Sequence, residues 1–234
     1  MAEFASPERI TLPDSKEDSG ERPFVRYIPE AIVDQRTAAL AGNIGEDYLS
    51  RGIRHIHMIT LAVGGMFWSV PLSLELQRQH PELIVTHGTV RLGSYGQETT
   101  TSGTVRDYGV LGDPVGGRHL FVVDEVVDTG NTMSWFIKRL TYGDPDSASG
   151  KAIPPASIAV AALVDKVDMH NGRVTVNYPG VAVQGNPWLV GVGMDHEGAG
   201  RALPAVYQSA RPQDTLTEGF TIPQTRPFEL LRAA

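Results

Sequence analysis

The chain has 234 residues, no cysteine and a formal net charge of −7 at pH 7. This length suits one sizeable domain, or at most two small ones, and the lack of cysteine excludes a disulfide framework, a thiolate nucleophile and a zinc-thiolate site. A mildly acidic balance without a run of Lys or Arg argues against a nucleic-acid surface, and no apolar stretch approaches the ~18 residues of a membrane span. Because the first residues lack the features of a signal peptide, we expect a cytoplasmic protein with no membrane contact.

The first part of the chain predicts a leader, a helix and a strand. Residues 1–22 are polar and indicate a flexible leader. Apolar residues recur at helical spacing from Pro29 to Arg51, and an apolar strand is expected from Ile53 to Leu61. Alternation places His55 and His57 on one side of this strand, and we interpret both as structural or surface residues because no acid stands at metal-ligand spacing.

A glycine-containing turn follows this strand. Ala62-Val63-Gly64-Gly65 leads into a helix that is expected to continue to about Gln79. Paired glycines let the backbone approach an anion at a helix N-terminus, although a Gly-Gly turn between strand and helix is common and therefore weak evidence. We then expect a strand over Leu83 to Leu92 and a polar loop, rich in hydroxyl groups, over residues 93–103.

The most informative stretch runs from Leu120 to Thr132. An apolar run, read as a buried strand, ends in the adjacent acids Asp124 and Glu125, and an Asp-Thr-Gly-Asn-Thr loop leads into an amphipathic helical segment, Met133 to Leu140. Acids at the carboxyl end of a strand suit sugar hydroxyls or a hydrated Mg²⁺ ion.

The loop itself suits a phosphate. The first N–H groups of a helix have no intrahelical partner, Gly130 permits close backbone approach, and the hydroxyls of Thr129 and Thr132 can donate hydrogen bonds. A site that binds a phosphate, vicinal hydroxyls and Mg²⁺ fits a ribose 5-phosphate. The alternative is a tight turn with a helix cap, which two acids at the end of an apolar run make the weaker interpretation.

The second half of the chain predicts one more buried strand and two less regular segments. Residues 142–155 form a Gly/Pro/Ser-rich insertion, and Ser157 to Val164 predict a buried parallel strand that ends in Asp165-Lys166. Residues 178–204 offer an aromatic plane at Trp188, a glycine-punctuated strand and an acid, features equally compatible with a packed edge strand.

Strands that alternate with helices predict an α/β fold, with a central, mostly parallel sheet and helices on both faces. The candidate ligand turns all follow strands, so we expect them to collect at one edge of this sheet. The expected organisation is a leader over 1–22, one domain over 23–210 and a C-terminal extension over 211–234.

The stretch from Leu120 to Thr132 resembles the signature of the type I phosphoribosyltransferases: four apolar residues, two acids, two apolar residues and Asp/Ala-Thr-Gly-x-Thr. The chain resembles the hypoxanthine/guanine (6-oxopurine) branch over residues 27 to 207, with the motifs in the same order. The resemblance implies the type I phosphoribosyltransferase fold with a small C-terminal hood at about 172–207. It also implies transfer of a 5-phosphoribosyl group from 5-phosphoribosyl 1-pyrophosphate (PRPP) to a purine base, with Mg²⁺ as cofactor, in a homodimer or homotetramer.

The resemblance assigns the PRPP site residue by residue. Asp124 and Glu125 would orient the ribose, Asp128 would accept or relay the proton on N7 of the base, and Thr129, Gly130, Asn131 and Thr132 would hold the 5-phosphate. Pyrophosphate would lie on Val63, Gly64, Gly65 and Arg201, and Ser94 and Tyr95 would begin a mobile loop. Val63 stands where the family usually has a lysine, which puts a side-chain role at this position in doubt.

The resemblance also assigns the base and metal sites. Lys166 would donate to the oxygen at C6 of the purine, Trp188 would stack on the base, and Leu189 would offer its backbone. Glu125 and Asp195 would hold Mg²⁺. His196 stands where a tyrosine is usual, which leaves the shape of the pocket open.

Two alternatives to purine salvage remain. The first is the same reaction on a modified base, such as a deazapurine of secondary metabolism, which Val63 and His196 motivate. The second is a non-catalytic regulator that senses PRPP. A P-loop nucleotide hydrolase fails, because the loop before Lys151 has the wrong spacing and Ala152 replaces the required Ser or Thr.

Overall fold

The computed structural model describes residues 6–17, 19–94, 105–107, 115–142, 153–214, 216–217 and 219–229. The strands are β1 (Arg9–Pro13), β2 (Glu21–Ile28), β3 (His55–Ala62), β4 (Ile84–Ser94), β5 (Val105–Asp107), β6 (His119–Val127), β7 (Ser157–Lys166), β8 (Tyr178–Val183), β9 (Leu189–Val190), β10 (Val206–Ser209) and β11 (Phe220–Thr221). The helices are α1 (Glu30–Ser50), α2 (Met66–Gln79), α3 (Asn131–Tyr142) and α4 (Val167–His170). Among these residues no helix is long and apolar enough to cross a lipid bilayer.

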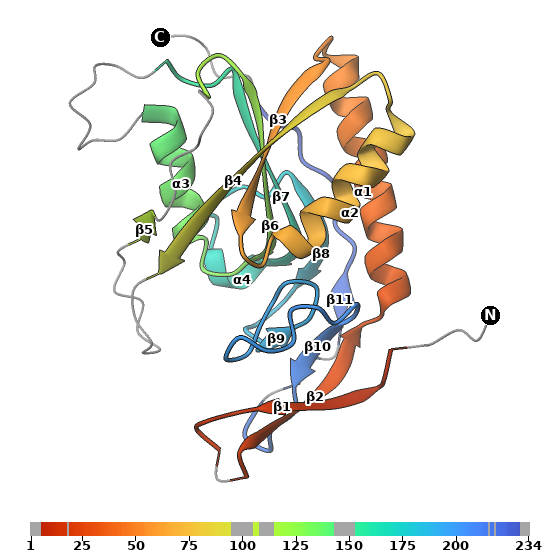
Figure 1. Ribbon diagram of the computed structural model, residues 1–234, viewed down its shortest axis with the longest axis vertical. Coiled ribbons are helices and arrows are strands. Elements are labelled where there is room, and N and C mark those ends of the chain that lie inside the picture. The colour runs from red at the N-terminus through yellow and green to blue at the C-terminus, as the bar shows by residue number, and fades with distance from the viewer. Residues whose placement is uncertain are drawn as a thin grey trace.

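A seven-stranded sheet in the order β11-β8-β7-β6-β3-β4-β5 forms the centre of the molecule (Figure 1). The strands from β8 to β4 in this order pair in parallel, while β5 and β11 are antiparallel edge strands. β6 and β7 are central because their apolar runs bury side chains on both faces. The predicted α/β class and mostly parallel sheet are confirmed.

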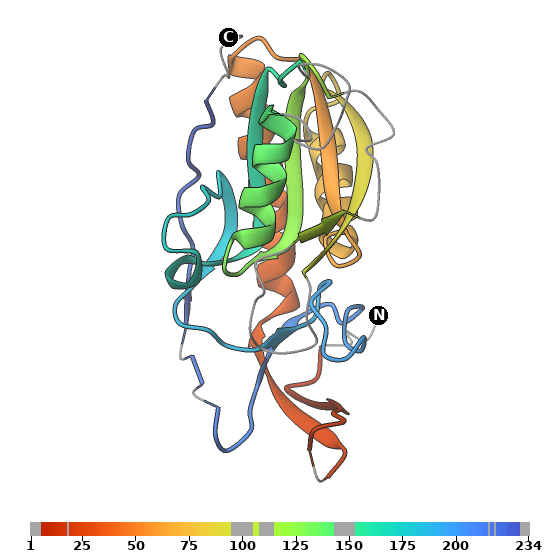
Figure 2. The ribbon, with the colours of Figure 1, turned by 90° about the vertical axis from the view of Figure 1, so that its left-hand side faces the viewer.

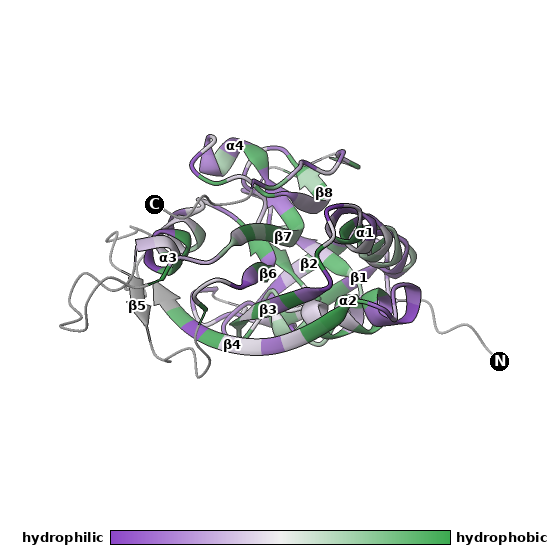
Figure 3. Cartoon of the chain, turned by 90° about the horizontal axis from the view of Figure 1, so that it is seen from above, coloured by the Kyte–Doolittle hydropathy of each residue, from purple (hydrophilic) through white to green (hydrophobic). Residues whose placement is uncertain are grey.

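Helices cover both faces of this sheet (Figures 2 and 3). α1 and α2 lie on one face, where Leu40, Ile44 and Trp68 join the larger core cluster. α3 lies on the other face and buries Met133, Phe136 and Leu140 in a second cluster. The spacing of these three α3 residues, three and then four positions apart, presents one apolar side to the sheet.

A second sheet, in the order β1-β2-β10-β9, forms a hood below the carboxyl ends of the parallel strands (Figure 1). Its strands come from both ends of the chain, because β2 pairs with β1 on one side and with β10 on the other. The hood was expected at about residues 172–207. β8 lies within that range but belongs to the large sheet, and the hood strands near the C-terminus, β9 and β10, lie within residues 189–209.

The expectation of a flexible leader over 1–22 is wrong for residues 9–13 and 21–22. Arg9 to Pro13 form β1, paired in register with Val25 to Glu21. The side chains of Asp14 and Arg22 are buried between the hood strands. Backbone pairing, the buried charges and the packing of Ile10 and Leu12 against the apolar cluster around Phe24 hold this hairpin. Its apolar residues alternate with polar ones and form no continuous run.

The described part of the C-terminal extension packs on the same chain. β11 pairs with β8, and the Phe228 ring stacks on Tyr48 of α1 with centroids 4.5 Å apart. Asn177 donates hydrogen bonds to the carbonyl groups of Arg226 and Pro227. The segment therefore completes the core beneath α1 of its own chain.

Candidate active site

A cavity of about 610 Å³ lies at the carboxyl ends of the parallel strands. Its walls bring together five parts of the chain: the turn after β3, the end of β4, the end of β6, the first turn of α3 and the loop between the hood strands β9 and β10. The lining includes most of the predicted pyrophosphate and metal positions, the predicted ribose-binding acid Asp124 and one phosphate-loop threonine, namely Val63, Gly64, Asp124, Glu125, Thr132, Asp195 and Arg201. The expected gathering of ligand turns at one sheet edge is therefore present.

The turn after β3 requires its glycines for packing. A Cβ at Gly64 would lie 1.9 Å from Oε1 of Glu125, and a Cβ at Gly65 would lie 2.6 Å from the carbonyl oxygen of Leu61. The peptide bond between Ala62 and Val63 is cis. The Val63 side chain is 44% exposed beside the cavity, so the absent lysine leaves an apolar group there.

The two acids at the end of the β6 apolar run form an uncompensated carboxylate pair. Oε2 of Glu125 is buried and has no hydrogen-bond partner within the described residues. Burial and the neighbouring Glu125 raise the pKa of Asp124 well above its ordinary range. Two adjacent carboxyl side chains on the cavity wall form an oxygen-donor set that fits a hard divalent ion such as Mg²⁺.

The second predicted metal position lies across the cavity. Oδ1 of Asp195 pairs with Nη2 of Arg201 at 2.5 Å, and its Oδ2 accepts a hydrogen bond from the backbone N–H of Gly198 at 2.7 Å. Arg201 also donates to the carbonyl oxygen of Gly193 at 2.6 Å. Arg201 is thus held between the hood and the cavity, with its positive charge beside the position expected for pyrophosphate.

The predicted phosphate loop leads directly into α3. Gly130 has a φ of +70°, which favours glycine, and α3 begins at Asn131. Nη1 of Arg173 donates to the carbonyl oxygen of Thr129 at 2.6 Å and fixes the loop from outside. The first turn of α3, whose backbone N–H groups have no intrahelical partner, therefore reaches the cavity wall at Thr132.

The predicted catalytic acid and the predicted base-binding lysine contact each other. Nζ of Lys166 donates to Oδ2 of Asp128 at 2.9 Å and to Oδ1 of Asn186 at 3.0 Å. Oδ1 of Asp128 is buried and has no hydrogen-bond partner in the described part of the chain. Asn186 was missed from the sequence, where its position two residues before Trp188 was the available signal.

The two predicted hood contacts to the base differ in exposure. The Trp188 side chain is 49% exposed, whereas Leu189 is 6% exposed and pairs with Gln208 of β10. The buried Leu189 side chain leaves only the backbone of this residue to contact a bound base. Tyr95 and the rest of the predicted loop to residue 103 lie outside the described residues, and Ser94 is the last residue of β4.

Arg91 is a further cavity residue that sequence reasoning missed. It lies near the carboxyl end of β4 and lines the cavity, and its Cα is the register partner of Ala62. The signal was a basic residue near the end of a parallel strand. Its guanidinium adds positive charge beside the turn that lacks the usual lysine.

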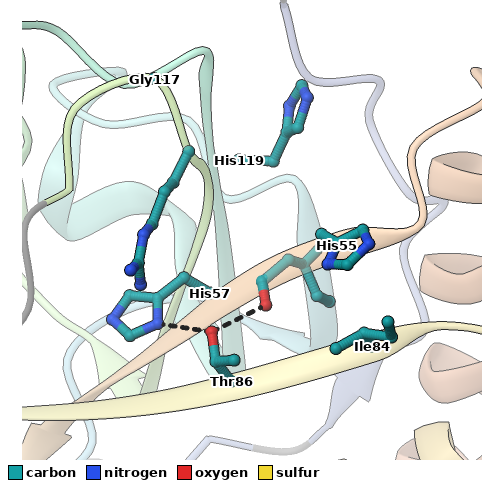
Figure 4. A pocket seen from close by; sticks show the side chains of 8 residues that line it. His55, His57, Ile84, Thr86, Gly117 and His119 are labelled. Atoms are coloured by element: carbon teal, nitrogen blue, oxygen red, sulfur yellow. Dashed lines mark hydrogen bonds between the residues drawn. The ribbon is translucent and has the colours of Figure 1, made fainter.

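A different pocket of about 320 Å³ lies at the amino ends of β3 and β6 (Figure 4). His57 is buried and its Nδ1 is hydrogen-bonded to Oγ1 of Thr86 at 2.8 Å, while His55 is exposed. Burial lowers the pKa of His119, whose Nδ1 is hydrogen-bonded to Oγ of Ser157 at 2.9 Å. The interpretation of His55 and His57 as surface and structural residues is confirmed.

The architecture is that of a known class. Hypoxanthine phosphoribosyltransferase from Trypanosoma cruzi, solved in complex with IMP, superposes with a TM-score of 0.67 at 22% identity, covering 80% of this chain and 94% of that one. A hypoxanthine phosphoribosyltransferase from Staphylococcus aureus gives 0.67 at 16% identity, covering 80% and 91%. The chain therefore has the type I phosphoribosyltransferase fold.

Sequence comparison points to the same group. The chain is 29% identical over 188 residues to the hypoxanthine-guanine phosphoribosyltransferase of Mycobacterium tuberculosis, covering 75% of this chain and 84% of that protein. It is 27% identical over 179 residues to the hypoxanthine phosphoribosyltransferase of Escherichia coli, covering 76% and 91%. No family model matches the chain. The predicted resemblance and the predicted enzyme class, a phosphoribosyltransferase, are confirmed.

Proposed function

We propose that this protein transfers the 5-phosphoribosyl group of PRPP to a ring nitrogen of a 6-oxopurine such as hypoxanthine or guanine, releasing pyrophosphate, in purine salvage. The observation that carries the proposal is the single cavity that joins the glycine turn, the paired acids, the phosphate loop and Arg201. These groups match the parts of PRPP: a pyrophosphate, two ribose hydroxyls and a 5-phosphate.

Catalysis would rest on positioning and on charge. Departure of pyrophosphate leaves positive charge on the ribosyl group, so the protein gains most by fixing the reactants and neutralising the leaving group. Gly64 and Gly65 would admit the pyrophosphate close to the backbone, and Arg201 would balance its charge. The first turn of α3 would hold the 5-phosphate.

Glu125 and Asp195 are the residues that would hold Mg²⁺, with Asp124 orienting the ribose hydroxyls. The bound ion would neutralise negative charge on the pyrophosphate oxygens. The buried Oε2 of Glu125, which has no hydrogen-bond partner within the described residues, supports this assignment. Addition of MgCl₂ with PRPP should raise the melting temperature of the wild type and not that of Glu125→Gln.

The base would lie between Trp188 and the pair formed by Asp128 and Lys166. The unpaired Oδ1 of Asp128 is available to accept the proton that leaves N7. Nζ of Lys166, buried against Asp128 and Asn186, would direct a hydrogen bond to the oxygen at C6. A 6-aminopurine carries a hydrogen-bond donor at C6, which cannot pair with the Nζ donor of Lys166, so the site would reject 6-aminopurines.

The test is a panel assay with purified protein, PRPP and Mg²⁺. Hypoxanthine, guanine, xanthine, adenine and a deazapurine are each offered, and release of pyrophosphate is followed. Rapid release with hypoxanthine or guanine supports the proposal. Asp128→Ala should lower kcat by about 10²-fold or more with little change in PRPP affinity; lost PRPP binding with unchanged kcat would contradict the role of Asp128.

A second candidate substrate is a modified purine. Val63 and His196 replace the lysine and tyrosine usual in the resembled family, and both lie at or beside the proposed site. Release of pyrophosphate only with the deazapurine would favour this candidate. Binding of PRPP without release for any base would favour a PRPP-sensing regulator.

A further inference from the structure

Three buried ionisable side chains lie directly behind Trp188, the proposed platform for the base. Asp14 and Arg22 come from the amino-terminal hairpin and His196 from the loop after β9; we call these three residues the hood polar cluster. Their exposed fractions are 2%, 6% and 5%, whereas Trp188 is 49% exposed. Three ionisable groups are thus removed from water around one aromatic ring that remains accessible.

Two members of the cluster contact the Trp188 ring. Cζ of Arg22 lies 5.3 Å from the ring centroid, within the range of a cation–π interaction. The His196 ring meets Trp188 edge-on, with centroids 5.8 Å apart and planes at 89°. The carbonyl oxygen of Trp188 accepts a hydrogen bond from the backbone N–H of Ser209 at 2.9 Å. The ring is therefore held by a cation, an edge contact and its backbone.

Asp14 joins these two contacts. Its Oδ2 lies 3.0 Å from Nε2 of His196 and 3.9 Å from Nη1 of Arg22. Its Oδ1 accepts a hydrogen bond from the backbone N–H of Lys16, which lowers the pKa of Asp14 and keeps the carboxylate ionised at neutral pH. Loss of this one charge would loosen both side chains that touch Trp188.

Arg22 has two further anchors near the C-terminal strand of the hood. Its Nε donates to Oγ of Ser209 at 2.7 Å, and its Nη2 lies 3.5 Å from Oδ2 of Asp214. The guanidinium is therefore fixed from three sides. Such fixation suits a group whose role is to hold a neighbouring ring in one orientation.

We propose that Asp14, Arg22 and His196 are positioning residues that hold the Trp188 indole as a preorganised face for a planar purine base. This inference rests on the proposed function, in which Trp188 stacks on the base. A half-exposed indole that rotates freely would lose side-chain entropy when the base binds, and a fixed indole avoids that cost. The amino-terminal hairpin thereby contributes to base affinity, while the PRPP cavity contains none of the three residues.

The test uses Asp14→Asn in the full chain. Steady-state kinetics give KM for hypoxanthine, KM for PRPP and kcat, and ¹⁹F NMR of 5-fluorotryptophan-labelled protein reports on the indole, with Trp188 assigned by Trp188→Phe. We expect KM for the base to rise about tenfold, with KM for PRPP and kcat within about twofold. The Trp188 resonance should move, those of Trp68 and Trp135 should not, and Asp14→Glu should restore part of the base affinity.

The matched control is Glu197→Gln. The exposed carboxylate of Glu197 lies within 4.8 Å of Asp14 and His196, but it accepts its hydrogen bonds from Ser15, at 3.0 Å from the backbone N–H and 2.6 Å from Oγ. Glu197→Gln therefore changes a charge beside the cluster without removing a contact to Trp188. We expect wild-type kinetics and a wild-type Trp188 resonance. Equal effects of Glu197→Gln and Asp14→Asn would indicate general loosening of the hood and overturn the inference.

Other outcomes are equally decisive. An unchanged KM for the base together with an unchanged Trp188 resonance in Asp14→Asn would overturn the inference. If Asp14→Asn does not fold, His196→Gln replaces it, because it removes the edge contact with Trp188. We expect the same rise in KM for the base and the same movement of the Trp188 resonance. If the wild type transfers to no base, the proposed function fails, and the Trp188 resonance alone then decides whether the cluster positions the ring.

Discussion

The site depends on a residue without a side chain, Gly64. A Cβ there would lie 1.9 Å from Oε1 and 2.3 Å from Cδ of Glu125. Gly64→Ala must therefore displace the carboxylate that is proposed to hold Mg²⁺. Because a displacement of about 1 Å can cost about 10²-fold in rate, we expect kcat/KM for PRPP to fall by about that factor.

Gly219→Ala is the control for this substitution. A Cβ at Gly219 would meet nothing within 4 Å, so activity and melting temperature should remain at the wild-type values. Full activity in Gly64→Ala would show that the Glu125 carboxylate is free to move without consequence and would contradict the assignment.

Asp124 provides a prediction on stability and pH. Burial and the neighbouring Glu125 raise the pKa of Asp124 in the folded state above its ordinary value of 3.8. At a pH between these two values the carboxyl is protonated in the folded chain and ionised in the unfolded chain, so folding takes up a proton. Its ionisation therefore destabilises the fold increasingly as the pH rises through that window. Asp124→Asn removes this destabilisation. The asparagine amide oxygen can still accept the hydrogen bond that the backbone N–H of Glu125 donates to Oδ1 of Asp124 at 3.0 Å.

We expect Asp124→Asn to raise the melting temperature at pH 8 by about 2–4 °C, equivalent to ~1 kcal/mol for a chain of this size. The gain should shrink as the pH is lowered and vanish near pH 4, where the carboxyl is protonated in both states. Thermal melts without Mg²⁺ across this range are the measurement. A gain that is independent of pH would exclude ionisation as its cause.

At the scale of elements, the C-terminal segment acts as part of the core. Phe228 is 3% exposed, its ring stacks on Tyr48, and Cζ of Arg51 lies 4.4 Å from its centroid. Phe228→Ala removes these contacts and leaves a cavity under α1. We expect it to lower the free energy of unfolding by about 3–5 kcal/mol in denaturant titration.

The effect should be on stability alone, because Phe228 does not line the proposed active-site cavity. Below the lowered melting temperature, KM for PRPP should remain at the wild-type value. Ile222→Ala, in the same segment but 53% exposed, should change stability by less than about 0.5 kcal/mol. A small effect of Phe228→Ala would mean that the segment is not docked in solution.

Elements with a long apolar period were predictable, whereas a short strand and a polar contact between separate segments were not. α1 and β7 follow their predicted ranges within a few residues, since helical or continuous apolar patterns fix them. β1 was missed because its apolar alternation, Ile10 and Leu12, covers only five residues within a polar stretch. Asn186 was missed because its contact with Lys166 joins two separate segments, and its position two residues before Trp188 does not by itself indicate that contact.

At the scale of the whole molecule, one helix carries an apolar surface that the described chain does not cover. The exposed residues Met66, Val70 and Leu74 follow one side of α2 at intervals of four, and their exposed fractions are 45%, 56% and 68%. An apolar stripe of this kind on a helix is typical of a subunit interface. The sequence resemblance implies a homodimer or homotetramer, and this stripe is the surface we expect it to use.

The double substitution Val70→Glu with Leu74→Glu tests that expectation. Placing four like charges in a twofold interface desolvates them without partners, so the complex should dissociate to monomers in sedimentation velocity. Because α2 begins beside the turn at Gly64 and Gly65, we also expect the monomer to bind PRPP more weakly. The exposed Leu216, 47% exposed and remote from α2 in sequence, provides the control: Leu216→Glu should leave the assembly intact. A wild type that sediments as a monomer at micromolar concentration would contradict the predicted assembly, and an oligomer that survives the double substitution would place its interface elsewhere.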